Sequence, residues 1–196
     1  MTPKEHWDNE WQKRIKDENS TVSRNVEKAG KIIYELCKRP GYIKLEKIDV
    51  GCGPPTHAIH LSDLYGGWDK TYTGIDLSEI AVQYGRDCGL NVIQGDFLEY
   101  QTEKKYDVFM FLDSLEHIFD HEKLSQKIKE LAAPGYYIIG NVPFYPNAHN
   151  KDPGLERDMD IKILKNFMWN SGVKIFNIDV YGALGYPYCF FEGMNV

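Results

Sequence analysis

The sequence predicts an α/β fold, with a mostly parallel seven-stranded sheet, an antiparallel hairpin at its C-terminal end and helices on both faces. Short apolar segments alternate with helical segments along the chain, which is typical of parallel sheets. Residues 106–112 are apolar on both faces, as a buried parallel strand should be. Only residues 182–187 join the last two predicted strands, 173–181 and 188–192. That connection is too short for a crossover helix, so these two strands should pair antiparallel.

The other elements follow from apolar spacing and from turn residues. Trp7 and Trp11 are four residues apart and would share one face of a first helix. Ser78 is a suitable N-cap for a helix that runs through Arg86. Further helices are predicted at 22–38, 57–65, 121–131 and 159–170. Further strands are predicted at 47–50, 72–76, 91–94 and 136–142.

Length and composition predict a single domain and a cytoplasmic location. The 196 residues fit a single domain, with an N-terminal helical cap at 1–40 and a core at 41–196. The chain lacks the roughly 18 consecutive apolar residues of a membrane span, and its first residues lack the apolar region of a signal peptide. The four cysteines are scattered, which predicts reduced thiols. The net charge of −6 argues against broad nucleic-acid binding. Because no insertion is large enough for an elaborate substrate domain, a small molecule is the expected partner.

Three predicted strands end in residues suited to a nucleoside-bearing ligand. The first runs into Gly51-Cys52-Gly53, where glycines let the backbone approach a ligand closely. The second ends at Asp76, whose carboxylate can accept from both hydroxyls of a ribose. The third ends at Asp96-Phe97, a carboxylate and an apolar ring that suit an adenine. Each feature also has a structural explanation, a tight turn or a helix cap, but ligands of such sheets bind where the strand ends converge.

In order and spacing, these motifs resemble class I S-adenosylmethionine-dependent methyltransferases. The resemblance covers about residues 47–143, and the helix and hairpin at the end of the chain also match that fold. It is carried by Lys47-Ile48-Asp49-Val50-Gly51-Cys52-Gly53-Pro54-Pro55, Gly74-Ile75-Asp76-Leu77-Ser78, Gln94-Gly95-Asp96-Phe97 and the small-molecule-type signature Leu115-Glu116-His117. It implies a Rossmann-like domain that uses S-adenosylmethionine as its cofactor.

The resemblance also implies a role for each motif residue. Gly51, Cys52 and Gly53 would cradle the methionine part of the cofactor, with Asp49 orienting the loop. The family usually has a third glycine where Pro55 stands. Because proline fixes φ and has no N–H donor, the loop should be tighter or the cofactor more weakly held.

The same reasoning extends to the later strands. Asp76 would bind the ribose, and Leu77 would pack on the adenine. Asp96 would accept from the adenine amino group with Phe97 beside it, and Asp113 would face cofactor and substrate at the end of the fourth strand.

The predicted reaction is O-methylation of a small molecule. A hydroxyl acceptor benefits from a base, and the predicted catalytic residues are His117 and His149, with Tyr145 as a further candidate. The stretch from Asp113 to His117 also resembles a Glu-x-x-Glu-His metal motif of ubiquinone-pathway and small-RNA ribose O-methyltransferases, which His149 would complete. We predict a route without metal, because Asp113 is one methylene shorter than the glutamate of that motif.

Several alternatives stay open at this point. A metal-assisted RNA ribose 2′-O-methyltransferase and a non-catalytic S-adenosylmethionine-binding protein are the main ones. A nicotinamide dehydrogenase is disfavoured, because Thr56 stands where Gly-x-Gly-x-x-Gly needs its third glycine. His57, His60 and His121 are expected on helix surfaces. Trp7 and Trp11 should cover the pocket mouth as a lid, with packing on a flank or on a partner chain as the alternative.

Overall fold

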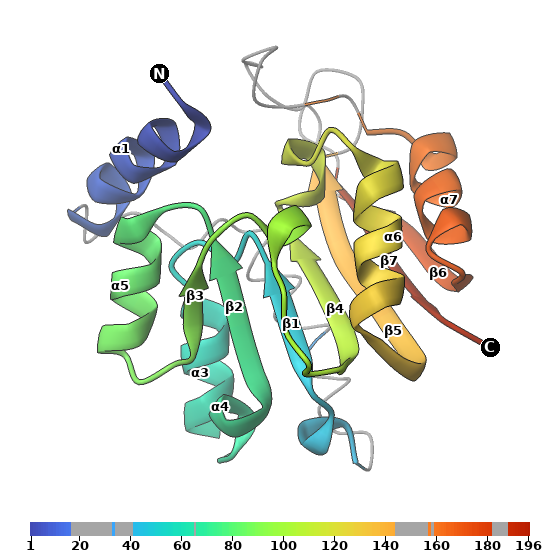
Figure 1. Cartoon of the computed structure of the whole chain (residues 1–196), viewed down its shortest axis with the longest axis horizontal. Helices are drawn as coiled ribbons and strands as arrows, with labels where there is room; N and C mark the ends of the chain where they lie inside the picture. The colour runs from blue at the N-terminus through green and yellow to red at the C-terminus, as the bar shows by residue number, and fades with distance from the viewer. Residues whose placement is uncertain (17–32, 34–40, 65, 144–156, 158, 182–187) are drawn as a thin grey trace. The chain divides into compact units, whose positions relative to one another are not determined.

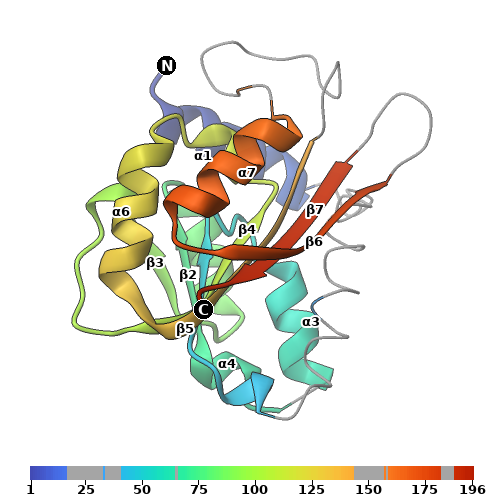
Figure 2. The same cartoon turned by 90° about the vertical axis from the view of Figure 1, so that its right-hand side faces the viewer.

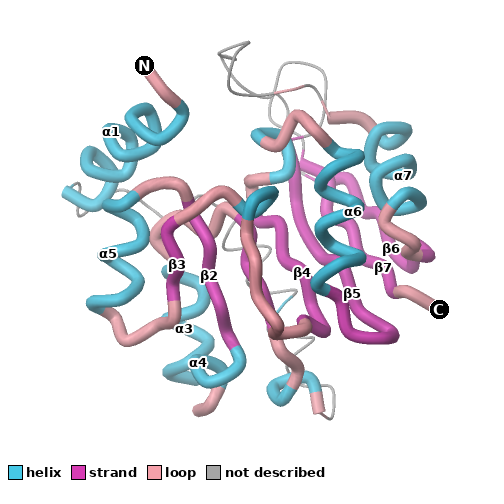
Figure 3. Tube along the Cα trace, in the orientation of Figure 1, coloured by secondary structure: helices cyan, strands magenta, loops and turns pink. Residues whose placement is uncertain are grey.

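The computed structural model describes residues 1–16, 33, 41–64, 66–143, 157, 159–181 and 188–196. The chain forms two compact units, Met1–Tyr100 and Gln101–Val196 (Figure 1). Within each unit, strands alternate with helices, as the colouring by secondary structure in Figure 3 shows. This alternation is the one that the sequence predicts.

The first unit is built on three parallel strands in the order β3-β2-β1. Every residue of β1 and β2 is buried, so both faces of these strands are covered. Asp49 of β1 lies opposite Gly74 of β2, and Asp76 of β2 lies opposite Gln94 of β3. The strands are β1 (Lys47–Val50), β2 (Tyr72–Asp76) and β3 (Val92–Gln94), and the α-helices are α1 (Pro3–Lys16), α3 (Thr56–Leu64), α4 (Trp68–Thr71) and α5 (Glu79–Asp87).

Local capping and packing fix the two helices that follow the strand ends. The Ser78 hydroxyl accepts from the N–H of Ala81, which confirms Ser78 as the N-cap of α5. Pro55 stands just before α3, where a proline is tolerated because its missing N–H would have no helical partner. A Cβ atom at Gly85 of α5 would lie 3.1 Å from Cγ of Pro55 and 2.6 Å from Cγ2 of Val92. Pro55, which stands where the family usually has a glycine, therefore packs against α5.

A fully buried lysine anchors the start of β1. The Lys47 ammonium donates to the carbonyl oxygens of Ile43 and Leu45 and to the hydroxyl of Thr71, at 2.6–3.0 Å. It also lies 4.5 Å from the ring centroid of Trp68. These contacts offset the free-energy cost of removing the ammonium group from water, so Lys47 is a structural residue.

The second unit contains the other four strands, in the order β4-β5-β7-β6. β4 and β5 are parallel, whereas β7 is antiparallel to both β5 and β6, which confirms the predicted C-terminal hairpin (Figure 2). Helices α6 and α7 lie side by side in both views. The elements are β4 (Tyr106–Leu112), α6 (His121–Leu131), β5 (Ala132–Pro143), α7 (Ile161–Asn170), β6 (Lys174–Tyr181) and β7 (Tyr188–Met194).

Most predicted elements are observed, with small differences at their ends. β5 begins at Ala132 instead of residue 136, because Ala132 pairs with Tyr106 before a register shift that places extra residues in β5. α7 begins at Ile161, after Asp160 caps it through the N–H of Ile163. The predicted helix at 22–38 lies outside the described residues except for Ile33. In the described part of the chain, no helix is long and apolar enough to cross a membrane.

Candidate functional site

The glycine loop after β1 has a geometry that needs glycine. Gly51 and Gly53 have φ values of 67° and 53°, in the left-handed region that side chains disfavour. The N–H groups of Gly51 and Cys52 both donate to the carbonyl oxygen of Ile75 in β2, at 2.8 and 3.2 Å. The loop is therefore fixed to the end of the neighbouring strand.

Asp76 connects the loop to the start of α5. Its Oδ2 accepts from the N–H of Gly53 and its Oδ1 from the N–H of Ser78, both at 2.8 Å. Its side chain is buried, and this burial raises the pKa of the Asp76 carboxyl to about 6. The structure thus brings the first two predicted motifs together around one buried carboxylate.

A second buried carboxylate lies beneath the loop. Asp49 is fully buried, and its Oδ2 accepts from the Tyr72 hydroxyl at 2.8 Å. Nε2 of His57 lies 3.0 Å from the same oxygen, at ion-pair distance but outside hydrogen-bond geometry. Burial raises the pKa values of the Cys52 thiol and the Tyr72 hydroxyl well above their usual ranges, so both stay neutral. These contacts place Asp49 as a support of the loop from below.

The predicted surface position of His57 is wrong. Its exposed fraction is 9%, because the N-terminal turn of α3 packs the imidazole against Asp49 and Tyr72. His60, one helical turn further on, is exposed as predicted. Gly74 belongs to the same cluster, since a Cβ atom there would lie 2.8 Å from Sγ of Cys52 and 3.1 Å from the Tyr72 hydroxyl oxygen.

The third predicted motif follows β3. Asp96 is exposed, and its Oδ1 accepts from the N–H of Leu98 at 2.9 Å, so it caps a 3-10 turn, Phe97–Glu99. Phe97 is buried, and Leu77 at the end of β2 is half-buried. The capping explanation for Asp96 therefore holds, and its Oδ2 makes no described hydrogen bond.

Helix α1 reaches the glycine loop. The rings of Trp7 and Trp11 are stacked with their centroids 6.0 Å apart, as expected for residues four apart on one helix face. A Cβ atom at Gly53 would lie 2.8 Å from Cζ2 of Trp11, so the indole occupies the space beside this glycine.

In the second unit, Asp113 is held in an unusual conformation at the end of β4. Its φ of 53° makes it the one non-glycine residue with positive φ among the described residues. The side-chain amide of Asn141 in β5 donates to Oδ1 of Asp113, and the N–H of Asp113 donates to the Asn141 carbonyl oxygen at 3.1 Å. Asn141 is fully buried and was not predicted as a site residue. Strained conformations of this kind gather at functional sites.

Glu116 and His117 lie in the 3-10 turn Leu115–His117 that follows Asp113. Glu116 is buried, whereas the His117 side chain is 19% exposed, and Nε2 of His117 lies 3.9 Å from Oε1 of Glu116. No group of three or more potential metal ligands occurs in the described ranges. His149, which the metal motif requires, and Tyr145 lie outside those ranges.

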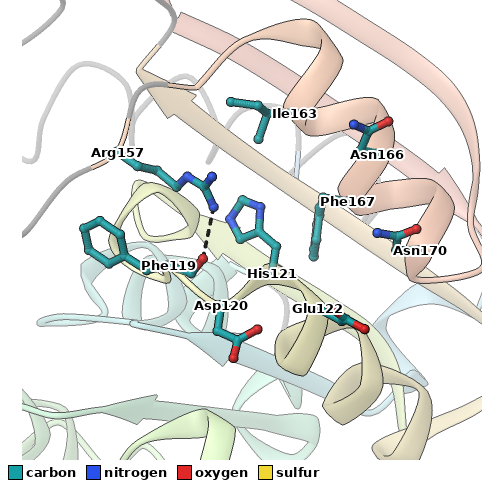
Figure 4. Close-up of a pocket in the computed structure, with 9 residues that line it drawn as sticks. All are labelled: Phe119, Asp120, His121, Glu122, Arg157, Ile163, Asn166, Phe167 and Asn170. Carbon is teal, nitrogen blue, oxygen red and sulfur yellow. Dashed lines mark hydrogen bonds between the residues drawn. The ribbon is translucent and has the colours of Figure 1, made fainter.

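A pocket of about 510 Å³ opens between the start of α6 and α7 (Figure 4). His121 was expected on a helix surface but is half-buried here, beside the Phe167 ring. Burial and the nearby Arg157 guanidinium lower the pKa of the His121 imidazole to about 4, so it is neutral near pH 7. Arg157 donates to the carbonyl oxygen of Phe119 at 3.1 Å. The lining residues are Phe119, Asp120, His121, Glu122, Arg157, Ile163, Asn166, Phe167 and Asn170.

Comparisons with known proteins agree with this description. A complex between the Haloferax volcanii Trm112 methyltransferase activator and the putative methyltransferase matches with a TM-score of 0.77 and 14% identity, covering 99% of this chain and 97% of the matched chain. Magnesium protoporphyrin IX methyltransferase from Synechocystis PCC 6803, with bound S-adenosylhomocysteine, matches with a TM-score of 0.74 and 16% identity, covering 98% and 97%. An S-adenosylmethionine-dependent methyltransferase from Aquifex aeolicus matches with a TM-score of 0.65 and 20% identity, covering 86% and 89%.

These similarities confirm the predicted fold class. A family model described as a methyltransferase domain matches residues 44–166, which include all four motifs. This chain therefore belongs to the methyltransferase-domain family, and the predicted class, S-adenosylmethionine-dependent methyltransferases of the class I fold, is confirmed.

Proposed function

We propose that this methyltransferase binds S-adenosylmethionine through the first unit and methylates a hydroxyl group of a small molecule. The observation that carries the proposal is the joining of the glycine loop and α5 by the buried Asp76 carboxylate. This arrangement puts a hydrogen-bond acceptor and a glycine-rich loop at the carboxyl ends of the strands, where ligands of parallel sheets bind.

The residues present fit the cofactor. Gly51 and Gly53 leave the loop without side chains where a ligand approaches, as their positive φ values require. Each oxygen of Asp76 accepts one backbone N–H, so each retains a lone pair for a ribose hydroxyl. Oδ2 of Asp96 and the neighbouring Phe97 are suited to an adenine. When bound, the sulfonium supplies a good leaving group, so the protein has to position the acceptor oxygen in line.

The affinity for S-adenosylmethionine should fall as the pH drops below about 6, the pKa of Asp76. Only the ionised carboxylate can accept from both ribose hydroxyls and both backbone N–H groups. Protonation therefore removes acceptor capacity, and the dissociation constant should rise by up to about tenfold per pH unit below this value. Calorimetric titrations from about pH 5 to about pH 7 measure this change in the dissociation constant. In Asp76→Asn, which lacks the titrating group, the affinity should be lower and flat over the same range.

For the acceptor step, we propose His117 as the general base and keep His149 as the second candidate. His117 follows Asp113 by four residues, its side chain is 19% exposed, and Oε1 of the buried Glu116 lies 3.9 Å from its Nε2. A carboxylate near an imidazole stabilises the imidazolium that forms when the base takes the acceptor proton. The proposed route uses no metal.

A small-molecule acceptor is supported by the charge and by the comparisons. The net charge of −6 disfavours broad binding to a phosphate backbone. One structural neighbour is named for a porphyrin acceptor, which is a small molecule. The alternatives are an RNA ribose acceptor and a non-catalytic protein that only holds the cofactor.

The test is a methyl-transfer screen with isotopically labelled S-adenosylmethionine. Pools of small hydroxylated and phenolic metabolites and a pool of total RNA are incubated separately with the protein, and labelled products are identified by mass spectrometry. We expect label in small-molecule products with wild type and much less with Asp76→Ala at the same low concentration of cofactor. Label found only in RNA would replace the proposed acceptor class, and its absence from every pool would favour the non-catalytic alternative.

With the acceptor identified, His117→Ala should lower kcat at least about tenfold and leave the affinity for the cofactor unchanged. A base acts on the acceptor proton, so its loss affects the chemical step and not cofactor binding. His149→Ala, assayed in parallel, identifies which imidazole is the base. Activity that chelators abolish and Mg²⁺ or Mn²⁺ restores would contradict the route without metal.

A further inference from the structure

Helix α1 contacts the proposed cofactor site at two separate points. The first is the indole of Trp11, whose edge fills the space beside Gly53. The second is the Asp8 carboxylate, whose Oδ1 accepts from the Ser78 hydroxyl at 2.6 Å and lies 3.4 Å from the backbone nitrogen of Ile80. Both partner segments, the glycine loop and the start of α5, also contact Asp76.

Asp8 contacts the start of α5, next to Asp76. It accepts where the first N–H groups of α5 have no helical partner, so it adds a second cap to that of Ser78. Lys4 holds the Asp8 carboxylate from one turn away at 2.7 Å, and also lies 3.5 Å from Glu79. Burial is the main cause of the raised pKa of Asp76, and the negative charge of Asp8 adds to it.

Trp11 is held in its orientation from within α1. Its ring stacks on that of Trp7, and the Arg14 guanidinium lies 5.0 Å from the ring centroid. These two contacts help to fix the orientation of the indole whose edge lies beside Gly53.

In the described ranges, α1 packs on α5 and on the glycine loop through half-buried side chains. None of its residues is buried, and a helix of 14 residues is marginally stable by itself. In the described structure, the contacts at Asp8 and Trp11 and the ion pair of Lys4 with Glu79 help to hold it on the first unit. A ligand that lies against both Asp76 and the glycine loop would add contact area beneath the helix.

We propose that Asp8 and Trp11 are positioning residues of the cofactor site, which hold α1 as a wall over the bound cofactor. This inference rests on the proposed binding of S-adenosylmethionine in the first unit. Binding of the cofactor and docking of α1 are then coupled, because each stabilises the arrangement that the other requires. The coupling makes two predictions, one for affinity and one for the mobility of α1.

The first test measures the affinity for S-adenosylhomocysteine by calorimetry in single variants of full-length protein. Asp8→Ala and Trp11→Ala should each raise the dissociation constant about tenfold, whereas Trp11→Phe should retain most of the affinity. The combined variant should lose little more than either single one, because both substitutions release the same helix. Lys16→Gln is the matched control, since Lys16 is exposed at the end of α1.

The second test separates positioning from mere structural support. Hydrogen exchange of peptides from residues 3–16 should slow when S-adenosylhomocysteine is added to wild type, and should not slow in Asp8→Ala. In that variant, the loss of cofactor affinity on protonation of Asp76 should also occur at lower pH, because the negative charge near Asp76 is gone.

Unchanged affinity in Asp8→Ala and Trp11→Ala, or exchange in α1 that the ligand leaves unaltered, would overturn the proposal while cofactor binding stands. Failure of the wild type to bind would instead overturn the proposed function itself. Tighter binding by Trp11→Ala would also contradict the proposed positioning role of Trp11, because it would show that the indole obstructs the cofactor.

Discussion

Asp76→Ala should weaken binding of S-adenosylmethionine by about 100-fold, which corresponds to about 3 kcal/mol. The substitution removes the acceptors proposed for the ribose hydroxyls. It also leaves the N–H groups of Gly53 and Ser78 without their carboxylate partner, so the loop and the start of α5 lose the contact that joins them. The effect should therefore exceed that of one lost hydrogen bond.

The measurement is a calorimetric titration of each variant with the cofactor, after circular dichroism has shown that it is folded. Asp63→Ala is a matched control, because Asp63 is exposed on α3 in the same unit. Asp76→Asn should fall between wild type and Asp76→Ala, since its one amide oxygen retains part of the acceptor capacity. An Asp76→Ala protein that binds within twofold of wild type would show that this carboxylate does not hold the ribose.

Asp49→Ala should lower the free energy of unfolding by about 3 kcal/mol. The Asp49 carboxylate is fully buried and accepts from the Tyr72 hydroxyl, with the His57 imidazole 3.0 Å away. Its removal leaves a buried hydroxyl without an acceptor and opens a cavity beneath the glycine loop. Urea denaturation followed by circular dichroism gives the difference.

A double-mutant cycle with Tyr72→Phe identifies the cause. In the Tyr72→Phe background, Asp49→Ala should cost about 1 kcal/mol less, because the hydroxyl that would lose its partner is already absent. Additive effects of the two substitutions would show that this hydrogen bond contributes nothing. A loss below about 1 kcal/mol in the single Asp49→Ala variant would contradict its role as the buried support of the loop.

The strand ends were predictable because their signals are local. Apolar runs, glycines and acids occur at fixed spacing around β1, β2 and β3, and the strand bounds differ by no more than one residue from those expected there. The contact between Gly53 and Asp76 joins residues 23 apart in sequence, yet parallel topology alone brings their segments to one edge.

The contacts that were missed depend on tertiary packing. A histidine at the start of an amphipathic helix gives no local sign of the buried carboxylate that His57 meets in β1. Asn141 and Asp113 are 28 residues apart and meet through the pairing of β4 with β5, which fixes their register only in the folded unit. The packing of Pro55 against Gly85 was also not predicted. That contact arises only once α5 has folded back beside the loop.

Binding of the cofactor by the wild-type protein is the most direct test of the central claim. Calorimetry near neutral pH should show that S-adenosylmethionine and S-adenosylhomocysteine each bind at one site per chain, with dissociation constants of about micromolar order. Their binding should be mutually exclusive in a competition titration. The absence of any binding with about 1 mM of either ligand would contradict the account.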